Sequence, residues 1–385
     1  MNISERLSKI NEYYFSTKLQ EIENLKKQGK DIISLAIGSP DLPPHPEVIK
    51  TLADEAANPK QHGYQTYRGT LMLRKAFADF YNRFYGVTLD PETEVLPLIG
   101  SKEGIFHICM SFLNHGDKVL LPSLGYPAYK AAVELSGGIP VFFEMNETNN
   151  YYPDFTALEK TDLSNIKLMW VNYPNMPTGQ MPTKELFTNL IAFGKRHNIL
   201  ICHDNPYSFI LNDNPMSLLS VPGAMDTAIE LNSLSKSHNM PGWRIGMLAA
   251  NKDIASEVLR FKSNIDTGIF FPMQAAAAKS LSLGNDWFRT VNDEYAQRRI
   301  SARQFMKEIN CSCNPAHSGM FVWGKIPDSV QDSYILADKI LHTAGIFITP
   351  GGVFGTDGNR FLRVSICAPV NVFQKAIERV QVLQW

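Results

Sequence analysis

An alternation of apolar runs and amphipathic stretches in the middle of the chain constrains its fold more than any other feature. Residues 167–174 (KLMWVNYP) and 199–207 (ILICHDNPY) are typical of buried strands, and residues 183–198 between them carry apolar side chains at helical spacing. A strand, a helix and a second strand in this order predict parallel neighbours joined by a right-handed crossover. Similar alternation around residues 116–123 and 227–235 predicts an α/β sheet with helices on both faces.

The pattern changes toward the C-terminus, where a long helix over residues 295–309 is followed by short strand-like runs and a further helix. We therefore expect residues 46–285 to form a large domain with a mostly parallel sheet sandwiched by helices, and residues 286–385 to form a smaller α+β domain. Residues 1–45 are expected to pack with the small domain, because their long helix precedes the first strand-like run at 32–38.

The composition is typical of a globular enzyme that acts on small molecules. The chain has 385 residues, 44% of them hydrophobic, and its 37 basic and 38 acidic side chains leave a formal charge of -1. This balance provides no positive field for a nucleic acid or an anionic membrane. There is no apolar run of about 18 residues and no secretory signal, so we expect a cytoplasmic enzyme without a nucleic-acid or membrane partner.

The five cysteines indicate neither a disulfide framework nor a metal site. Cys109, Cys202 and Cys367 lie in apolar stretches and are expected to be buried, reduced thiols. Cys311 and Cys313 are closely spaced, but no second Cys/His pair at ligand spacing accompanies them, so no metal is expected.

Polar residues that follow the strand-like runs are the candidates for a functional site, because ligands of parallel sheets bind outside the carboxyl ends of the strands. The GSKEG segment at 100–104 follows an apolar run and opens a helix-like stretch. Its backbone N–H groups and the Ser101 hydroxyl would suit a phosphate at a helix N-terminus. An ordinary turn is the alternative interpretation of this segment.

Asp204 ends a second apolar run, where an ionised carboxylate needs a cationic or donating partner to offset its desolvation. A protonated pyridine nitrogen would be such a partner, and a helix cap or a salt bridge would be others. Tyr207, three residues later, is placed to donate a phenolic hydrogen bond to the same ring, or simply to pack.

Lys236 follows the strand-like run 227–233, and Arg244 comes eight residues later. A lysine that forms a Schiff base needs a dry position that lowers its pKa, whereas most lysines are exposed. An arginine can bind a phosphate dianion through two parallel hydrogen bonds. Neighbouring serines and the Gly-Trp-Arg turn favour a phosphate and Schiff-base site here.

Eight segments of the chain together resemble the class I/II aminotransferases, which are pyridoxal-phosphate (PLP) enzymes of fold type I. They occur in the family's order across nearly the whole chain: LAIGSPD (35–41), GYQTYRGTLMLRKA (63–76), GSKEG (100–104), PSLGYPAY (122–129), NYPNMPTG (172–179), HDNPY (203–207), SLSKSHNMPGWRIG (233–246) and FLRVS (361–365). The resemblance is closest to the group that includes aspartate, LL-diaminopimelate, methionine and aromatic aminotransferases. It implies a ping-pong exchange of an amino group between an L-amino acid and a 2-oxo acid, with pyridoxal 5'-phosphate as cofactor.

The resemblance also implies roles for individual residues. Lys236 is similar to the lysine that holds the cofactor and moves the substrate's α-proton, and Asp204 to the partner of the pyridine nitrogen. Tyr207 matches the donor to the ring oxygen O3′, and Tyr126 matches the aromatic side chain that stacks on the ring. The residues that match the family's phosphate cup are Ser101, Lys102, Ser233, Ser235 and Arg244.

Three further residues concern the substrate and the partner subunit. Arg363 resembles the arginine that binds the substrate α-carboxylate, and Gly38 lies where the family's N-terminal loop meets the same group. Tyr64 matches a tyrosine that reaches the phosphate of the neighbouring subunit. A homodimer with shared active sites is therefore implied.

One departure from the family pattern concerns the contact to O3′. The family has asparagine directly before Pro-Thr-Gly, whereas this chain has Met176 there and Asn175 one position earlier. Methionine cannot donate a hydrogen bond. Either Asn175 takes over the contact, or Tyr207 makes it alone; the second is favoured, because a shift by one residue reverses side-chain direction in an extended segment.

Other functions are compatible with parts of the pattern. A β- or γ-lyase or a synthase on the same fold is the main alternative, and a PLP-sensing transcription regulator is a remote one. A nicotinamide-dependent enzyme lacks its G-x-G-x-x-G turn. The substrate side chain is not specified, although the aromatic segment Tyr13, Tyr14 and Phe15 is a candidate lid for apolar, aromatic or long side chains, with helix packing as the alternative.

Overall fold

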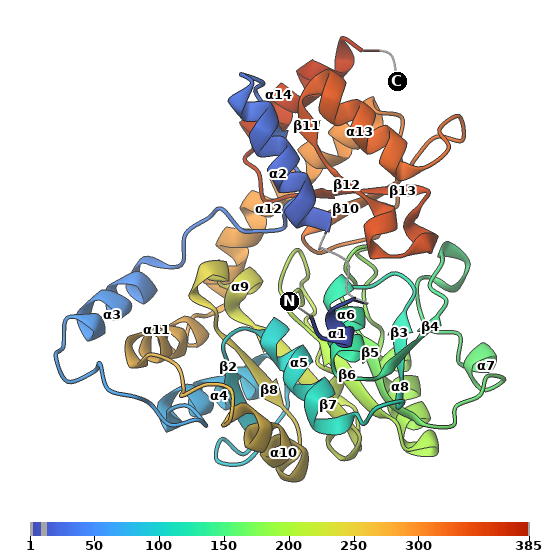
Figure 1. The fold of residues 1–385 in the computed structure, drawn as a ribbon. Helices are drawn as coiled ribbons and strands as arrows, with labels where there is room; N and C mark the ends of the chain where they lie inside the picture. The colour runs from blue at the N-terminus through green and yellow to red at the C-terminus, as the bar shows by residue number, and fades with distance from the viewer. Residues whose placement is uncertain (1–2, 9–13, 384–385) are drawn as a thin grey trace.

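The computed structural model describes residues 3–8 and 14–383, and it contains two regions with separate sheets (Figure 1). The larger region is built on a seven-stranded sheet in the order β2-β8-β7-β6-β5-β3-β4. Only β8 runs antiparallel to its neighbours. The strands are β2 (Val95–Leu98), β3 (Lys118–Pro122), β4 (Ile139–Phe143), β5 (Ile166–Val171), β6 (Leu200–Asp204), β7 (Ala228–Ser233) and β8 (Gly246–Ala249).

Helices cover both faces of this sheet, because its side chains alternate between two apolar clusters. Leu168 of β5 packs with α5, α6 and α10, whereas Met169 packs in the cluster that includes α4 and α8. The helices of the region are α3 (Pro46–Ala56), α4 (Leu71–Tyr85), α5 (Ser101–Phe112), α6 (Pro127–Leu135), α7 (Phe155–Leu158), α8 (Lys184–His197), α9 (Leu234–Ser237), α10 (Lys252–Lys262) and α11 (Phe271–Leu281). Burial on both faces explains why the strands are continuously apolar.

The predicted strand-helix-strand unit is confirmed. It consists of β5, α8 and β6, and Leu168 pairs in parallel with Leu200. The Thr183 side chain caps the start of α8 by accepting a hydrogen bond from the Leu186 N–H, and Asn198 ends the helix in a left-handed conformation. These local signals set the length of the unit and bring Asp204 to the carboxyl end of the sheet.

The smaller region contains a four-stranded sheet in the order β12-β13-β10-β9, with β10 antiparallel to β13. Its elements are α12 (Asn285–Glu308), β9 (Ser312–Cys313), β10 (Phe321–Lys325), α13 (Ser333–Ala344), β11 (Ile346–Phe347), β12 (Thr349–Pro350), β13 (Phe361–Ser365) and α14 (Val370–Gln381). The helix predicted over residues 295–309 thus begins ten residues earlier, at Asn285. The structure therefore has the predicted architecture, an α/β region with a mostly parallel sheet and a smaller α+β region.

Most of the N-terminal segment packs with the smaller region as predicted: α2 (Tyr14–Lys27) shares an apolar cluster with it, and β1 (Ile33–Ser34) pairs in parallel with β11 (Figure 1). The first helix, α1 (Glu5–Ser8), departs from this prediction and lies against α6 of the larger region. On this basis we propose to keep the domain limits at residues 45 and 285. Among the described helices, none is both long and apolar enough to cross a membrane.

Candidate active site

A cavity of about 410 Å³ lies where the carboxyl ends of the large sheet face the smaller region. Most of the predicted site residues line it: Gly38, Ser101, Lys102, Tyr126, Asp204, Tyr207, Ser233, Ser235, Lys236, Arg244 and Arg363. Asn175 and Tyr64 do not. Residues from six separate parts of the sequence therefore meet in one cavity.

Lys236 stands on the short helix α9, directly after β7. Its ammonium donates a hydrogen bond to the Gly38 carbonyl oxygen. Burial lowers the pKa of Lys236, and the positive charges of Arg363 and Arg244 act in the same direction. A lysine in this environment releases its proton more readily than an exposed one, as a nucleophilic amine requires.

Asp204 is fully buried at the end of β6, and burial raises the pKa of its carboxyl group to about 6. Its Oδ2 accepts a hydrogen bond of 2.9 Å from the Tyr129 hydroxyl. Its Oδ1 is also buried and has no hydrogen-bond partner among the described residues. A buried carboxylate with an open oxygen is suited to a cationic or N–H-bearing ligand.

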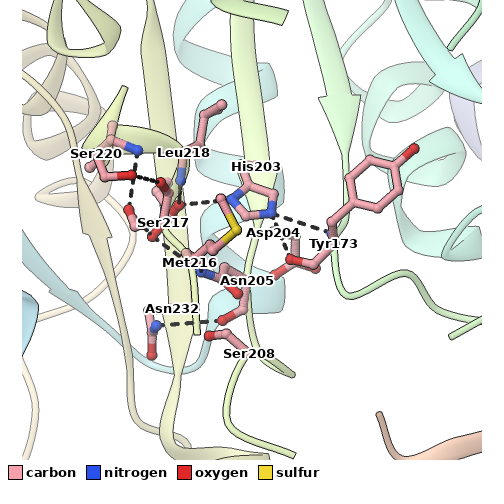
Figure 2. A network of polar contacts seen from close by, with 12 residues as sticks. Tyr173, His203, Asp204, Asn205, Ser208, Met216, Ser217, Leu218, Ser220 and Asn232 are labelled. Atoms are coloured by element: carbon pink, nitrogen blue, oxygen red, sulfur yellow. Dashed lines mark hydrogen bonds and ion pairs between the residues drawn. The ribbon is translucent and has the colours of Figure 1, made fainter. Parts of the chain in front are cut away.

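Glu230 is a second buried carboxylate, one strand away on β7. Both of its oxygens are saturated: Oε1 accepts from Tyr81, Ser217 and Asn205, and Oε2 accepts from the Leu218 N–H. The fifth neighbour, His203 Nδ1, lies 2.7 Å from Oε2. Figure 2 labels four of these neighbours, His203, Asn205, Ser217 and Leu218, and also Asp204, which directly follows His203 along the chain.

The N-terminus of α5 forms a cradle with Arg244. Gly100 precedes this helix with a φ of 85° and provides no side-chain cap for its N–H groups. A Cβ at this position would lie 2.1 Å from Arg244 Nη2, so only glycine lets the guanidinium lie against the helix start. Ser101 opens the helix, and its N–H direction and the arginine charge suit a phosphate.

Arg363 reaches the cavity from β13 of the smaller region. Nη2 donates a 2.9 Å hydrogen bond to the Ala36 carbonyl oxygen, and Nη1 lies 3.3 Å from the Met176 sulfur. The guanidinium lies 4.0 Å from the Phe321 ring centroid and 4.5 Å from that of Phe354. The basic group is therefore set among apolar side chains, where an ion pair with a substrate carboxylate is strong.

In the segment where Met176 replaces the family's asparagine, the Asn175 side chain forms hydrogen bonds within its own loop. Its Oδ1 accepts hydrogen bonds from the Thr178 N–H and hydroxyl, and its Nδ2 donates to the Asn172 carbonyl oxygen. Met176 lines the cavity instead, together with Asn172. Of the two residues predicted to donate to O3′, Tyr207 lines the cavity and Asn175 does not.

The candidate lid and the predicted intersubunit residue are also placed. Phe15 lines the cavity, whereas Tyr14 packs edge-on against Tyr334 with 6.0 Å between ring centroids. Tyr13 lies outside the described residues. Tyr64 does not line the cavity and is 92% exposed, and its contact with a second subunit stays a prediction.

Sequence reasoning missed several residues of the cavity. Tyr129 and Asn172 lie within segments that carry the family resemblance, but neither had an assigned role. Phe321 and Phe354 come from the smaller region, and no signal beyond their apolar character marks them. Their positions depend on how the two regions pack.

A cluster outside the cavity has ligand atoms of Glu103, His107 and Asp266 within 4.8 Å of one another. The Lys262 ammonium donates a 2.7 Å hydrogen bond to Asp266 Oδ1. A cation of the protein itself therefore already balances one of the two carboxylates.

The cavity fits PLP in two independent ways. The open, buried oxygen of Asp204 suits a protonated pyridine nitrogen, and the cradle of Gly100 and Arg244 suits the phosphate group. Lys236 lies in the same cavity and has a lowered pKa. The fold and this donor set define a PLP-dependent transferase of fold type I.

Comparisons with known proteins agree with this class. Residues 30–380 match the family model of aminotransferase class I and II. The LL-diaminopimelate aminotransferase of Dehalococcoides mccartyi is 37% identical over 99% of this chain and 98% of its own length. Its counterpart in Aquifex aeolicus is 36% identical over 99% of both chains.

Among solved structures, apo BacF from Bacillus subtilis superposes with a TM-score of 0.95 at 33% identity, covering 100% of this chain and 99% of that one. The chain therefore belongs to the class I and II aminotransferase family, and it is a PLP-dependent aminotransferase. The predictions of fold, enzyme class and cofactor are confirmed. The comparisons give no support to a lyase, a synthase or a regulator.

Proposed function

We propose that Lys236, Asp204, Tyr207 and Arg363 carry out the transamination. The observation that supports this assignment is their convergence on one cavity from the carboxyl end of β6, from α9 directly after β7, and from β13. When bound, PLP supplies an electron-withdrawing ring that stabilises negative charge at the substrate α-carbon.

Lys236 would hold the cofactor through Nζ, and as a free amine Nζ would move the proton at the substrate α-carbon. Its lowered pKa favours the free amine that this step needs. Asp204 would favour the protonated form of the ring nitrogen, because its buried Oδ1 has no hydrogen-bond partner among the described residues. Burial raises the pKa of Tyr207, so its hydroxyl remains a hydrogen-bond donor to O3′.

The phosphate would be held by Arg244, Ser101, Ser233 and Ser235, with the Lys102 backbone contributing at the start of α5. Tyr126 would pack on the face of the ring, because it precedes α6 and lines the same cavity. Arg363 would bind the substrate α-carboxylate with the Gly38 backbone beside it, which fixes the reacting carbon for every substrate. Asn175 has no role in this proposal.

The preferred substrate is an L-amino acid with an apolar side chain. Apolar residues surround the Arg363 end of the cavity: Phe15, Ile37, Met176, Phe321 and Phe354. The charged residues that line it are Lys102, Asp204, Lys236, Arg244 and Arg363, and each has a place at the cofactor or the α-carboxylate. A charged distal group would lose hydration without a dedicated partner in this set.

LL-diaminopimelate is the second candidate substrate, because the relatives that are 36–37% identical carry that name. It differs from the first candidate in having a charged amino and carboxyl group at its distal end. Affinity for it would require a partner from outside the lining residues of one chain.

Half-reaction spectra decide between the candidates. The PLP-loaded enzyme is mixed separately with L-phenylalanine, L-methionine, L-glutamate and LL-diaminopimelate, and conversion to the pyridoxamine form is followed. We expect the apolar donors to convert the enzyme fastest. Conversion only by an acidic donor or by LL-diaminopimelate would contradict the apolar assignment, and no conversion by any donor would contradict a transaminase.

We further propose that the enzyme is a homodimer. Exposed apolar side chains gather near the loop before α4 and the start of α11: Tyr64, Tyr67, Leu71, Met72 and Phe270. His62 and Phe270 are in ring contact at 5.6 Å, which links the loop to α11. An apolar surface of this kind is typical of a protein interface.

Sedimentation of wild type and Leu71→Glu tests the dimer, which we expect the added charge to weaken. A wild-type monomer with full activity would contradict it. A cytoplasmic location remains a prediction from the sequence, and cell fractionation would test it.

A further inference from the structure

We infer that Tyr129 is a positioning residue, whose hydroxyl ties one oxygen of the Asp204 carboxylate and directs the other toward the ring nitrogen of the cofactor. The inference rests on the role proposed for Asp204. Nothing in the family resemblance assigned a role to Tyr129.

The hydrogen bonds of the carboxylate carry the argument. Tyr129 donates to Oδ2 at 2.9 Å, whereas Oδ1 is buried without a partner among the described residues. The two oxygens of Asp204 are therefore not equivalent. Because a carboxylate rotates as a unit, fixing Oδ2 also fixes the direction of Oδ1.

Tyr129 is itself held firmly. It is 1% exposed on α6, and its ring is stacked on Trp170 with centroids 5.2 Å apart and an angle of 12° between the planes. Tyr126 packs edge-on against it at 5.7 Å. A ring constrained on these sides offers its hydroxyl in one direction only.

The other side-chain hydrogen bond to Asp204 reaches its main chain and not its carboxylate. Asn172 Nδ2 donates a 2.6 Å hydrogen bond to the Asp204 carbonyl oxygen, which fixes the end of β6 but not the carboxylate. Among the described residues, the Tyr129 hydroxyl is the one hydrogen-bond donor to the carboxylate. Losing it would free the side chain to rotate.

The charges around Asp204 make this hydroxyl important for ionisation as well. Burial raises the pKa of Asp204, while the Tyr129 hydrogen bond and the charges of His203 and Lys236 lower it. Tyr207 faces the same carboxylate. Burial and the neighbouring carboxylate hold the pKa of Tyr129 far above its ordinary value, so Tyr129 stays a donor throughout the working pH range.

The test is Tyr129→Phe, which removes the hydroxyl and keeps the ring that stacks on Trp170. Dissociation constants of the apoenzyme are measured by equilibrium dialysis for PLP and for 1-deaza-PLP, an analogue with carbon in place of the ring nitrogen. We expect roughly tenfold weaker binding of PLP and little change for the analogue. The acid-side loss of PLP affinity should also move to higher pH, because Asp204 loses a bond that favours its ionised form.

Tyr81→Phe is the matched control. Tyr81 donates a 2.8 Å hydrogen bond to Glu230, so the variant also removes a buried tyrosine-carboxylate bond, but outside the cavity. We expect it to lower the melting temperature without changing the affinity ratio of PLP to the analogue. A similar change of that ratio in Tyr81→Phe would overturn a specific role for Tyr129.

Asp204→Asn separates the two proposals. If Asp204→Asn abolishes the preference for PLP over the analogue but Tyr129→Phe weakens both ligands equally or neither, the inference about Tyr129 fails alone. If Asp204→Asn leaves the preference intact, the proposed role of Asp204 fails, and the inference fails with it.

Discussion

The two buried carboxylates of neighbouring strands, Asp204 on β6 and Glu230 on β7, are treated in opposite ways. Glu230 is surrounded by hydrogen-bond donors on both oxygens. Asp204 accepts one bond from Tyr129, and its other oxygen is buried without a hydrogen-bond partner among the described residues. We therefore expect Glu230 to stabilise the fold and Asp204 to serve a ligand.

The contrast has a simple physical basis. A buried carboxylate is stable only when donors replace the water it has lost, and Glu230 meets this condition inside the protein. Asp204 does not, and burial accordingly raises its pKa to about 6. The binding site is therefore destabilised locally until a donor from a ligand completes it.

The largest expected effect is a loss of activity from a substitution in the cavity that Asp204 lines. Lys236→Ala removes the amine that we propose to bind the cofactor and to move the α-proton, so transamination should fall by more than roughly 10⁴-fold. The visible absorbance of the lysine-bound cofactor should disappear, while far-UV circular dichroism remains as in wild type. Full activity with an unchanged visible band would contradict the assignment of this lysine.

The next effect concerns the saturated carboxylate. Five neighbouring groups are arranged around the Glu230 carboxylate, and in Glu230→Gln they would face a neutral amide. The free energy of unfolding should therefore drop by roughly 3–5 kcal/mol. Urea unfolding of the apoenzyme measures this change. Glu47→Gln, which alters an exposed carboxylate, is the control and should change little. A Glu230 variant as stable as its control would break the comparison.

Asp204→Asn should raise the free energy of unfolding of the apoenzyme, whereas Glu230→Gln should lower it. Because the folded-state pKa is raised from 3.8 to about 6, wild type loses stability as pH rises through this window, and the variant does not. Above pH 6 the apo variant should be more stable than apo wild type by about 3 kcal/mol. Thermal unfolding between pH 4 and 8 checks this.

Equal stabilities of the two apoenzymes at every pH would show that Asp204 carries no desolvation cost. Added PLP should reverse the order, since only the wild-type carboxylate gains a partner on binding. Wild type and Asp204→Asn thus measure both the cost of burying the Asp204 carboxylate in the apoenzyme and the gain when PLP binds to it.

The smallest expected effect is at Met176, which stands where the family pattern has asparagine. Met176→Asn introduces a donor near O3′ and should lower the pH midpoint of the cofactor's visible absorbance change by roughly one unit. Met176→Leu, which adds no donor, should leave the midpoint in place. An unchanged midpoint in the asparagine variant would mean that Tyr207 and the surrounding residues already satisfy O3′.

Much of the fold followed from local patterns. The apolar runs and helical spacing around β5, α8 and β6 defined a parallel unit, because strand and helix periodicities are properties of neighbouring residues. The same reasoning placed Asp204 and Lys236 at strand ends, where polar groups of a parallel sheet meet. The N-terminal pairing of β1 with β11 was anticipated only as packing with the small domain.

Individual hydrogen bonds did not follow from such patterns. The Asn175 side chain is engaged within its own loop, and Asn172 and Met176 take the places that face the cavity. A choice between adjacent residues depends on the exact path of a turn, and sequence spacing does not specify that path. The sequence therefore defined the segment but not the residue.

By itself, the sequence determined the class of fold, the cofactor and the residue types at the carboxyl edge of the sheet, since these depend on periodicity and on motifs of short range. Only the tertiary structure decided that Tyr129 occupies one oxygen of Asp204, that Glu230 is saturated, and that Arg363 enters among aromatic rings. These outcomes depend on atoms from distant segments approaching within a few ångströms. Such contacts are fixed by the packing of the two regions as a whole, so no local pattern contains them.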